Sequence, residues 1–150
     1  MSDQSIIPKV LFHLAFPVGN IEDTKSFYLD GLGCTAGRES IASIIVNFHD
    51  NQLVAHVVKE PLIKQIGIYP RHFGLIFTQE DQWFELAERA EKQRLNFYQS
   101  PKLRFEGKLI EHRTMFLEDP FYNLLEFKFY RNYEAIFGGQ EYAEIGDPEG

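Results

Sequence analysis

Apolar and polar residues follow an order along this chain that occurs twice. In the first half, Val10–Val18 alternates apolar and polar positions in the way that suits a buried strand. Asn20 is a good helix N-cap, and the segment after it has helix-like apolar spacing up to Gly31 and Gly33, which stop the helix. Three strand candidates follow: Cys34–Glu39, Ser43–Phe48 and Gln52–Val58.

The second half repeats this order after a linker that contains Pro61, Gly67 and Pro70. A strand is predicted at His72–Phe77, and the clearest helix of the chain at Glu80–Arg94. The strand candidates that follow are Phe97–Gln99, Arg104–Phe105, Leu109–Leu117 and Asn123–Tyr130. The pattern therefore predicts an α+β fold built from two modules, each with the order strand, helix and three strands.

The length of 150 residues fits a single domain, spanning 1–150. We assign module one to about residues 8–60, module two to about 70–130, and an acidic, Gly-rich tail to 131–150. Fourteen Phe and seven Tyr predict a core, or a pocket, lined by aromatic rings.

Net charge, the length of the apolar runs and cysteine content disfavour several classes of partner and location. The net charge of −7 disfavours nucleic acid as a partner, because phosphate binding needs clustered Lys and Arg. No apolar run is long enough to cross a membrane, and the N-terminus lacks the apolar core of a signal peptide. Cys34 is the single cysteine, which excludes an intrachain disulfide and favours a buried structural thiol. We expect a soluble, cytoplasmic protein without a nucleic-acid or membrane partner.

Strand alternation predicts where the histidines point. Successive strand side chains face opposite sides, so Phe12, Leu14 and Phe16 lie on the helix-covered face and His13 on the other. The same argument turns three more ionisable side chains away from the helices. They are His56, His72 and Glu126.

Two imidazoles and a carboxylate on one face form the 2-His-1-carboxylate set that binds Fe(II), and that also serves Zn, Mn or Ni. A lone strand His is more often structural or exposed. The matching places of His13 and His72 in the two modules, with Glu126 on the same face, favour a metal site instead. His56 is predicted either as a fourth ligand or as a neighbouring acid–base group.

Two segments resemble the vicinal oxygen chelate superfamily, whose members include glyoxalase I, fosfomycin and bleomycin resistance proteins, and type I extradiol dioxygenases. They are FHLAFPVGNIEDTKSFYLDGLG, which resembles the family's opening, and DPFYNLLEF, which is similar to its closing motif. The resemblance covers about Val10–Tyr130. It implies a cupped, barrel-like mixed sheet with helices on the outside, around one divalent metal bound by His13, His72 and Glu126.

The resemblance leans toward an extradiol ring-cleaving dioxygenase with Fe(II), an aromatic vicinal-diol substrate and O₂. His56 is then the catalytic acid–base group, and the predicted substrate contacts are His112, Phe116 and Tyr122. Phe116 stands where the dioxygenase signature carries a Tyr, and Tyr122 replaces the usual turn Gly. Two other interpretations therefore stay open: a glyoxalase I or epimerase-type lyase or isomerase working through a metal-bound enediolate, and a non-catalytic small-molecule-binding protein of the resistance type. A homodimer is also implied by the resemblance.

Overall fold

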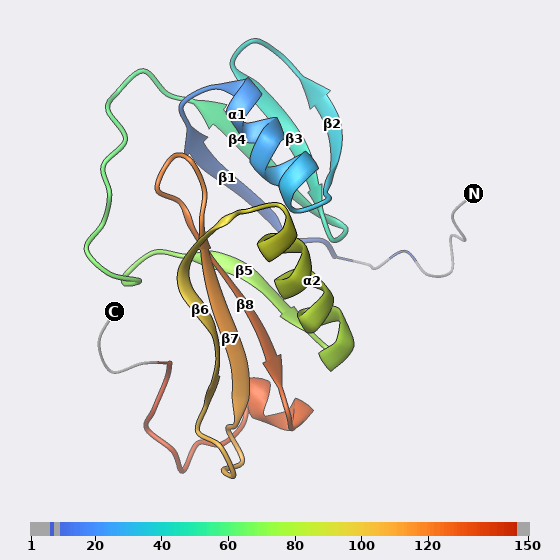
Figure 1. Ribbon diagram of the computed structural model, residues 1–150, viewed down its shortest axis with the longest axis vertical. Coiled ribbons are helices and arrows are strands. Elements are labelled where there is room, and N and C mark those ends of the chain that lie inside the picture. Colours follow the sequence, from blue (N-terminus) through green and yellow to red (C-terminus); the bar gives the residue numbers. More distant parts are fainter. Residues whose placement is uncertain (1–6, 8–9, 147–150) are drawn as a thin grey trace. The chain divides into compact units, whose positions relative to one another are not determined.

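The computed structural model describes residue 7 and residues 10–146 of the chain. The chain divides into two compact units, Met1–Leu62 and Ile63–Gly150. Each unit contains a four-stranded mixed sheet and one main helical segment (Figure 1). The predicted order of strand, helix and three strands, occurring twice in an α+β fold, is confirmed.

Unit 1 runs β1 (His13–Val18), α1 (Ile21–Lys25) with a following π-helical turn (Ser26–Gly31), β2 (Thr35–Glu39), β3 (Ser43–Phe48) and β4 (Asn51–Val57). Its sheet order is β1-β4-β3-β2, with β1 parallel to β4 and the other pairs antiparallel. The N-cap expected at Asn20 is present, since its side-chain oxygen accepts a hydrogen bond from the backbone N–H of Asp23 at 2.7 Å.

The core of unit 1 forms between β1 and the helical segment. Phe16 packs against Tyr28, with ring centroids 5.4 Å apart, and Val18 is fully buried. His13 lies on the opposite, exposed face, as alternation predicts. The expectation for Phe12 was wrong, because Phe12 precedes the first residue of β1 and is 61% exposed. Cys34, expected to be buried, is half-buried.

Unit 2 runs β5 (Phe73–Phe77), α2 (Glu80–Lys92), β6 (Asn96–Arg104), β7 (His112–Glu118) and β8 (Leu124–Tyr130), followed by a 3₁₀ turn (Tyr133–Ile136). The sheet order β5-β8-β7-β6 repeats that of unit 1, again with the first and last strands parallel. The two strand fragments expected around Phe97–Gln99 and Arg104–Phe105 are one strand, β6. Its register against β7 shifts twice, which explains why no regular alternation is visible in the sequence.

Helix α2 covers one face of the unit 2 sheet (Figure 1). Trp83 is the anchor: it is 1% exposed, and its indole N–H donates to the Phe127 carbonyl at 2.8 Å. Leu125, Phe127 and Phe129 of β8 are buried, as the alternation predicts. Glu126 and Lys128 therefore project from the face that α2 does not cover.

The turn between β7 and β8 is held by Asp119. Its carboxylate accepts hydrogen bonds from the backbone N–H groups of Phe121 and Asn123, both at 2.8 Å. Tyr122 has a φ of 69°, the left-handed region that favours glycine. This backbone geometry gives a physical reason for the glycine that the family usually has at this place.

The described part of the tail, residues 131–146, belongs to unit 2 and contacts the loop between β6 and β7. Asn132 donates to the Leu109 carbonyl at 3.1 Å, and Lys108 lies 3.9 Å from Glu144. A Cβ at Gly146 would lie 2.7 Å from the Tyr69 hydroxyl and 3.5 Å from the Arg104 guanidinium. The tail therefore passes beside the end of β6 on which Arg104 lies.

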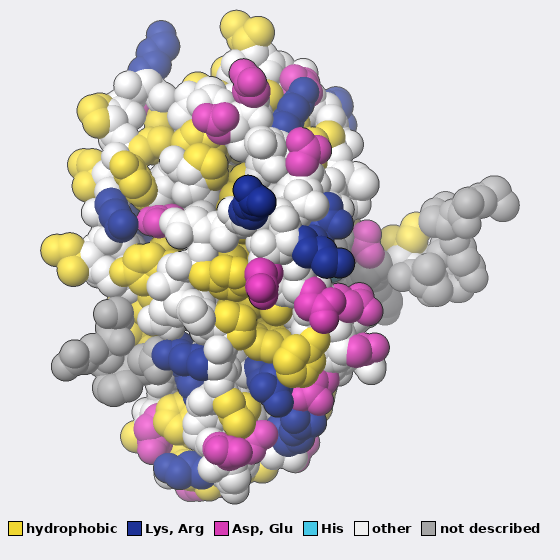
Figure 2. Space-filling model, in the orientation of Figure 1, with side chains coloured by type: hydrophobic (Ala, Val, Ile, Leu, Met, Phe, Trp, Pro, Cys, Tyr) yellow, Lys and Arg dark blue, Asp and Glu magenta, His cyan; other side chains and the backbone are white. Residues whose placement is uncertain are grey.

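Acidic and basic side chains are interspersed over the face shown in Figure 2. None of the helices in the described part of the chain has the length and apolar character needed to cross a membrane.

Candidate metal and substrate site

His72 is fixed at the entry to β5 by its own loop. Its Nδ1 lies 2.8 Å from the Ile68 carbonyl oxygen, so Nδ1 carries the donated proton. The ring also contacts the edge of the buried Phe116 ring, with centroids 5.0 Å apart and planes at 82°. These contacts orient Nε2 toward Glu126, whose Oε1 is 3.1 Å away.

Glu126 is a buried carboxylate in the centre of the unit 2 sheet, 5% exposed. Its Oε2 accepts hydrogen bonds from the Thr114 hydroxyl at 2.5 Å and from the Arg104 guanidinium at 3.2 Å. Gly74 is its neighbour on β5, where a Cβ would lie 1.6 Å from the Glu126 carbonyl oxygen. Only glycine fits here, because β5 approaches the backbone of Glu126 so closely.

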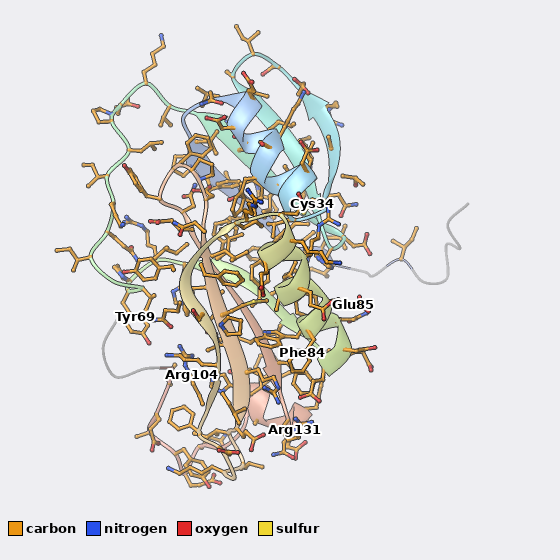
Figure 3. The ribbon with its side chains drawn as sticks, in the orientation of Figure 1. Cys34, Tyr69, Phe84, Glu85, Arg104 and Arg131 are labelled. Carbon is orange, nitrogen blue, oxygen red and sulfur yellow. The ribbon has the colours of Figure 1, made fainter. Side chains whose placement is uncertain are left out.

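Arg104 is in turn held by His112. The His112 Nδ1 donates to the Ile110 carbonyl at 2.9 Å, which leaves Nε2 to accept from the Arg104 guanidinium at 3.3 Å. His112 is 4% exposed and stacks near Tyr130, with ring centroids 4.7 Å apart. Arg104 and Tyr69 lie on the side of the sheet away from α2, which carries Phe84 and Glu85 (Figure 3).

This network shifts three pKa values. The hydrogen bond that the His72 ring donates to the Glu126 carboxylate raises the pKa of His72 above its usual value. Burial alone would raise the pKa of Glu126, but His72, Lys128, Thr114 and Arg104 together lower it. Burial lowers the pKa of His112. At neutral pH, Glu126 is therefore ionised and His112 neutral.

We predict that the two histidines of the metal-free protein titrate on opposite sides of the ordinary His pKa. In an NMR titration, the His72 ring should protonate above 6.5 and the His112 ring below 6.5. Glu126→Gln should lower the pKa of His72, because it removes the charged acceptor. Since its folded pKa is raised, His72 stabilises the fold below its unfolded pKa, and this contribution is lost as pH rises through the folded pKa. A His72 pKa unchanged in Glu126→Gln would contradict the pairing.

His13 and His56 lie in unit 1, on the exposed face of its sheet. The His13 Nδ1 is 2.8 Å from the Gln52 side-chain oxygen. His56 pairs with Pro17, four residues beyond His13 on β1, which places the two histidines roughly 13 Å apart along the strands. That His13 joins His72 and Glu126 around one ion stays a prediction.

Strand register shows which residue of unit 1 matches Glu126. In unit 2, Gly74 lies two residues after His72 and pairs with Glu126. In unit 1, Ala15 lies two residues after His13 and pairs with Val54. Val54, and not His56, therefore occupies the place that matches Glu126. His56 matches Lys128 instead, which lies two residues beyond Glu126. The apolar Val54 cannot be a ligand, so the position in unit 1 that matches Glu126 offers no fourth ligand.

The sequence prediction missed three side chains of this network: Arg104, Thr114 and Lys128. Of the predicted substrate contacts, His112 lies behind Arg104, Phe116 packs on His72, and Tyr122 is exposed at the β7–β8 turn. Their contact with a substrate stays a prediction. Within each unit, taken over the described residues, no three His, Cys, Asp or Glu side chains gather as a metal site.

Comparison with known proteins decides the family. The model of the Glyoxalase/Bleomycin resistance protein/Dioxygenase superfamily matches residues 10–127. The chain belongs to this superfamily. No curated protein matches the chain significantly.

Among solved structures, a relative of more than 30% identity supports the same assignment, and more distant structures share the fold. A glyoxalase/bleomycin resistance protein/dioxygenase from Alicyclobacillus acidocaldarius is 36% identical, with a TM-score of 0.81, over 86% of this chain and 97% of that one. The fosfomycin resistance protein FosX of Listeria monocytogenes is 15% identical with a TM-score of 0.66, over 85% and 98% of the two chains. Lactoylglutathione lyase from Agrobacterium tumefaciens is also 15% identical, with a TM-score of 0.63, over 88% and 98%. The last two show the fold alone.

Proposed function

We propose that this superfamily member is a divalent-metal-dependent enzyme in which His13, His72 and Glu126 bind the ion. The observation that carries the proposal is the geometry of the His72–Glu126 pair. The Ile68 carbonyl fixes the tautomer that leaves Nε2 for an ion, and Arg104 and Thr114 hold the inner carboxylate oxygen. Such outer hydrogen bonds are what orient metal-binding His and carboxylate side chains in proteins. The residues present therefore fit a divalent cation.

The chemistry that we infer first is ring cleavage of an aromatic vicinal diol with O₂, most like an extradiol dioxygenase. This proposal is supported by the strand register, because Val54 occupies the position in unit 1 that matches Glu126 and cannot be a fourth ligand. The proposed ligands are then two His and one carboxylate, a set suited to Fe(II). Bound iron would supply positions for the two substrate oxygens and for O₂. His56 is exposed on the same face of unit 1 as His13, and is assigned to take the proton of a substrate hydroxyl.

A second candidate is a proton-transfer lyase or isomerase of the glyoxalase I type, with Zn, Mn or Ni. Phe116, which contacts His72, lacks the hydroxyl group that a Tyr would offer. Arg104 and Lys128 near Glu126 would suit a substrate that gains negative charge during the reaction. This chemistry needs no O₂. On the family resemblance, we also infer a cytoplasmic homodimer.

We expect His56→Ala to lower kcat by roughly 100-fold or more, the usual contribution of an acid–base group, with metal affinity unchanged. The assay is O₂ uptake with a panel of catechols, using anaerobically purified, iron-loaded protein. His49→Ala is the matched control, because His49 is an exposed turn residue of the same unit and should behave as wild type.

Three outcomes of this assay separate the candidates. Turnover that needs O₂ supports the dioxygenase. Turnover of a hydroxy-carbonyl substrate without O₂ supports the lyase or isomerase and contradicts the dioxygenase. Untagged protein that holds no metal and turns nothing over is a binding protein of the resistance type, and the enzyme proposal is then wrong.

A further inference from the structure

The two oxygens of the Glu126 carboxylate have different surroundings. Oε2 faces Arg104 and Thr114, which are buried. Oε1 lies 3.1 Å from the His72 imidazole and 3.8 Å from the Lys128 ammonium, and both of these side chains are 23% exposed. Oε1 is therefore the outer oxygen, and it lies between an imidazole and an ammonium group that a ligand can reach.

Lys128 has hydrogen-bonding capacity left for such a ligand. Its ammonium donates to the Tyr130 hydroxyl at 3.3 Å and lies 5.6 Å from the centroid of that ring. An ammonium has three N–H donors, and its distance of 3.8 Å from Glu126 is longer than a hydrogen bond. The strand fixes its place, since Lys128 follows Glu126 by two residues on the same face of β8.

A divalent ion on His72 and Glu126 would lie close to this ammonium, and like charges repel strongly at such distances. Arg104, 3.2 Å from the inner oxygen, adds further positive charge. One buried carboxylate would then face an ion, an ammonium and a guanidinium. A negatively charged group between the ion and Lys128 would offset the excess positive charge.

We propose that Lys128 makes the site selective for an anion: a small molecule that carries a carboxylate, or a similar oxyanion, at or beside its metal-binding oxygens. This inference names the substrate class of the proposed metal site and rests on that proposed function. Lys128 is then a specificity-determining residue, at the same register position that His56 holds in unit 1.

Two small probes test the charge preference. Glycolate and glycolamide both offer a hydroxyl and an adjacent carbonyl oxygen to a metal, and differ in charge. Their dissociation constants are measured by calorimetry with Mn(II)-loaded and metal-free protein, for wild type, Lys128→Met and Lys128→Arg. Lys64→Met is the control. It removes the same charge from an exposed Lys of unit 2 that lies 3.7 Å from Glu118.

Wild type should bind glycolate more tightly than glycolamide. Lys128→Met should lower the ratio of these two affinities roughly tenfold. Lys128→Arg should keep most of the preference for glycolate, and Lys64→Met should keep all of it. Without either probe, Lys128→Met should bind Mn(II) several-fold more tightly than wild type, because the repulsion is gone. A glycolate preference as high in Lys128→Met as in Lys64→Met would overturn the inference, whatever the metal affinity.

The two proposals fail separately. If Mn(II) binding depends on Glu126 but the preference for glycolate does not depend on Lys128, the metal site is supported and the proposed substrate class is refuted. If the protein binds no Mn(II), but the metal-free protein binds glycolate and this binding requires Lys128, the anion site is supported and the metal-dependent function is refuted.

Discussion

Replacing Glu126 with Gln is expected to lower the affinity for a divalent metal by roughly 100-fold or more, since loss of even a supporting group near a metal costs 10–100-fold. The substitution keeps the size of the side chain and removes its charge. A neutral amide is a weaker ligand for a hard cation, and it also leaves the Arg104 guanidinium without its carboxylate partner at 3.2 Å. The measurement is a calorimetric titration with Mn(II) or Zn(II).

Glu118→Gln is the matched control for this titration. Glu118 is also a buried acid of the unit 2 sheet, 8% exposed, and it accepts a hydrogen bond from Asn96 at 3.0 Å. We expect this variant to bind metal as wild type does. Equal metal affinities of Glu126→Gln and wild type would remove Glu126 from the proposed ligand set.

Gly74→Ala is expected to reduce the free energy of unfolding of unit 2 by about 3 kcal/mol, at the upper end of overpacking costs. The added methyl group would lie 1.6 Å from the Glu126 carbonyl oxygen and 2.9 Å from its backbone nitrogen. Backbone atoms of a central strand cannot move aside as a side chain can, so β5 must separate from β8. Chemical denaturation measures the loss.

Gly37→Ala provides the comparison for Gly74→Ala, because Gly37 also lies within a strand. There the nearest atom is the Ile45 Cγ2 at 3.0 Å, which belongs to a side chain. We expect a cost of about 1 kcal/mol or less at this position, because that side chain can adjust. Similar unfolding free energies for the two variants would show that β5 and β8 are not as close as the structure has them.

Much of the fold and part of the site follow from alternation alone. The rule that neighbouring strand residues face opposite sides puts His72 and Glu126 on the face that α2 leaves open, and their side chains meet at 3.1 Å. The repeated order of elements is equally visible, because turn residues such as Gly33 and Pro70 separate the apolar runs.

Register is what the sequence could not provide. Residues 54 and 56 have the same parity, so alternation assigns both to the exposed face and cannot choose between them. Only the pairing of β1 with β4 shows that Val54, and not His56, matches Glu126. Arg104 was missed for a related reason, since the shifts in register along β6 break the period that would have revealed its face.

The central claim is that one ion joins the leading histidines of both units to Glu126. Its most direct test is anomalous diffraction from crystals of the protein loaded with one equivalent of Mn(II) or Zn(II). We predict a single strong peak within about 2.3 Å of His72 Nε2, Glu126 Oε1 and a ring nitrogen of His13, the usual range for such ligands. A fully occupied metal peak away from the His72–Glu126 pair, or one bound without His13, would contradict the account.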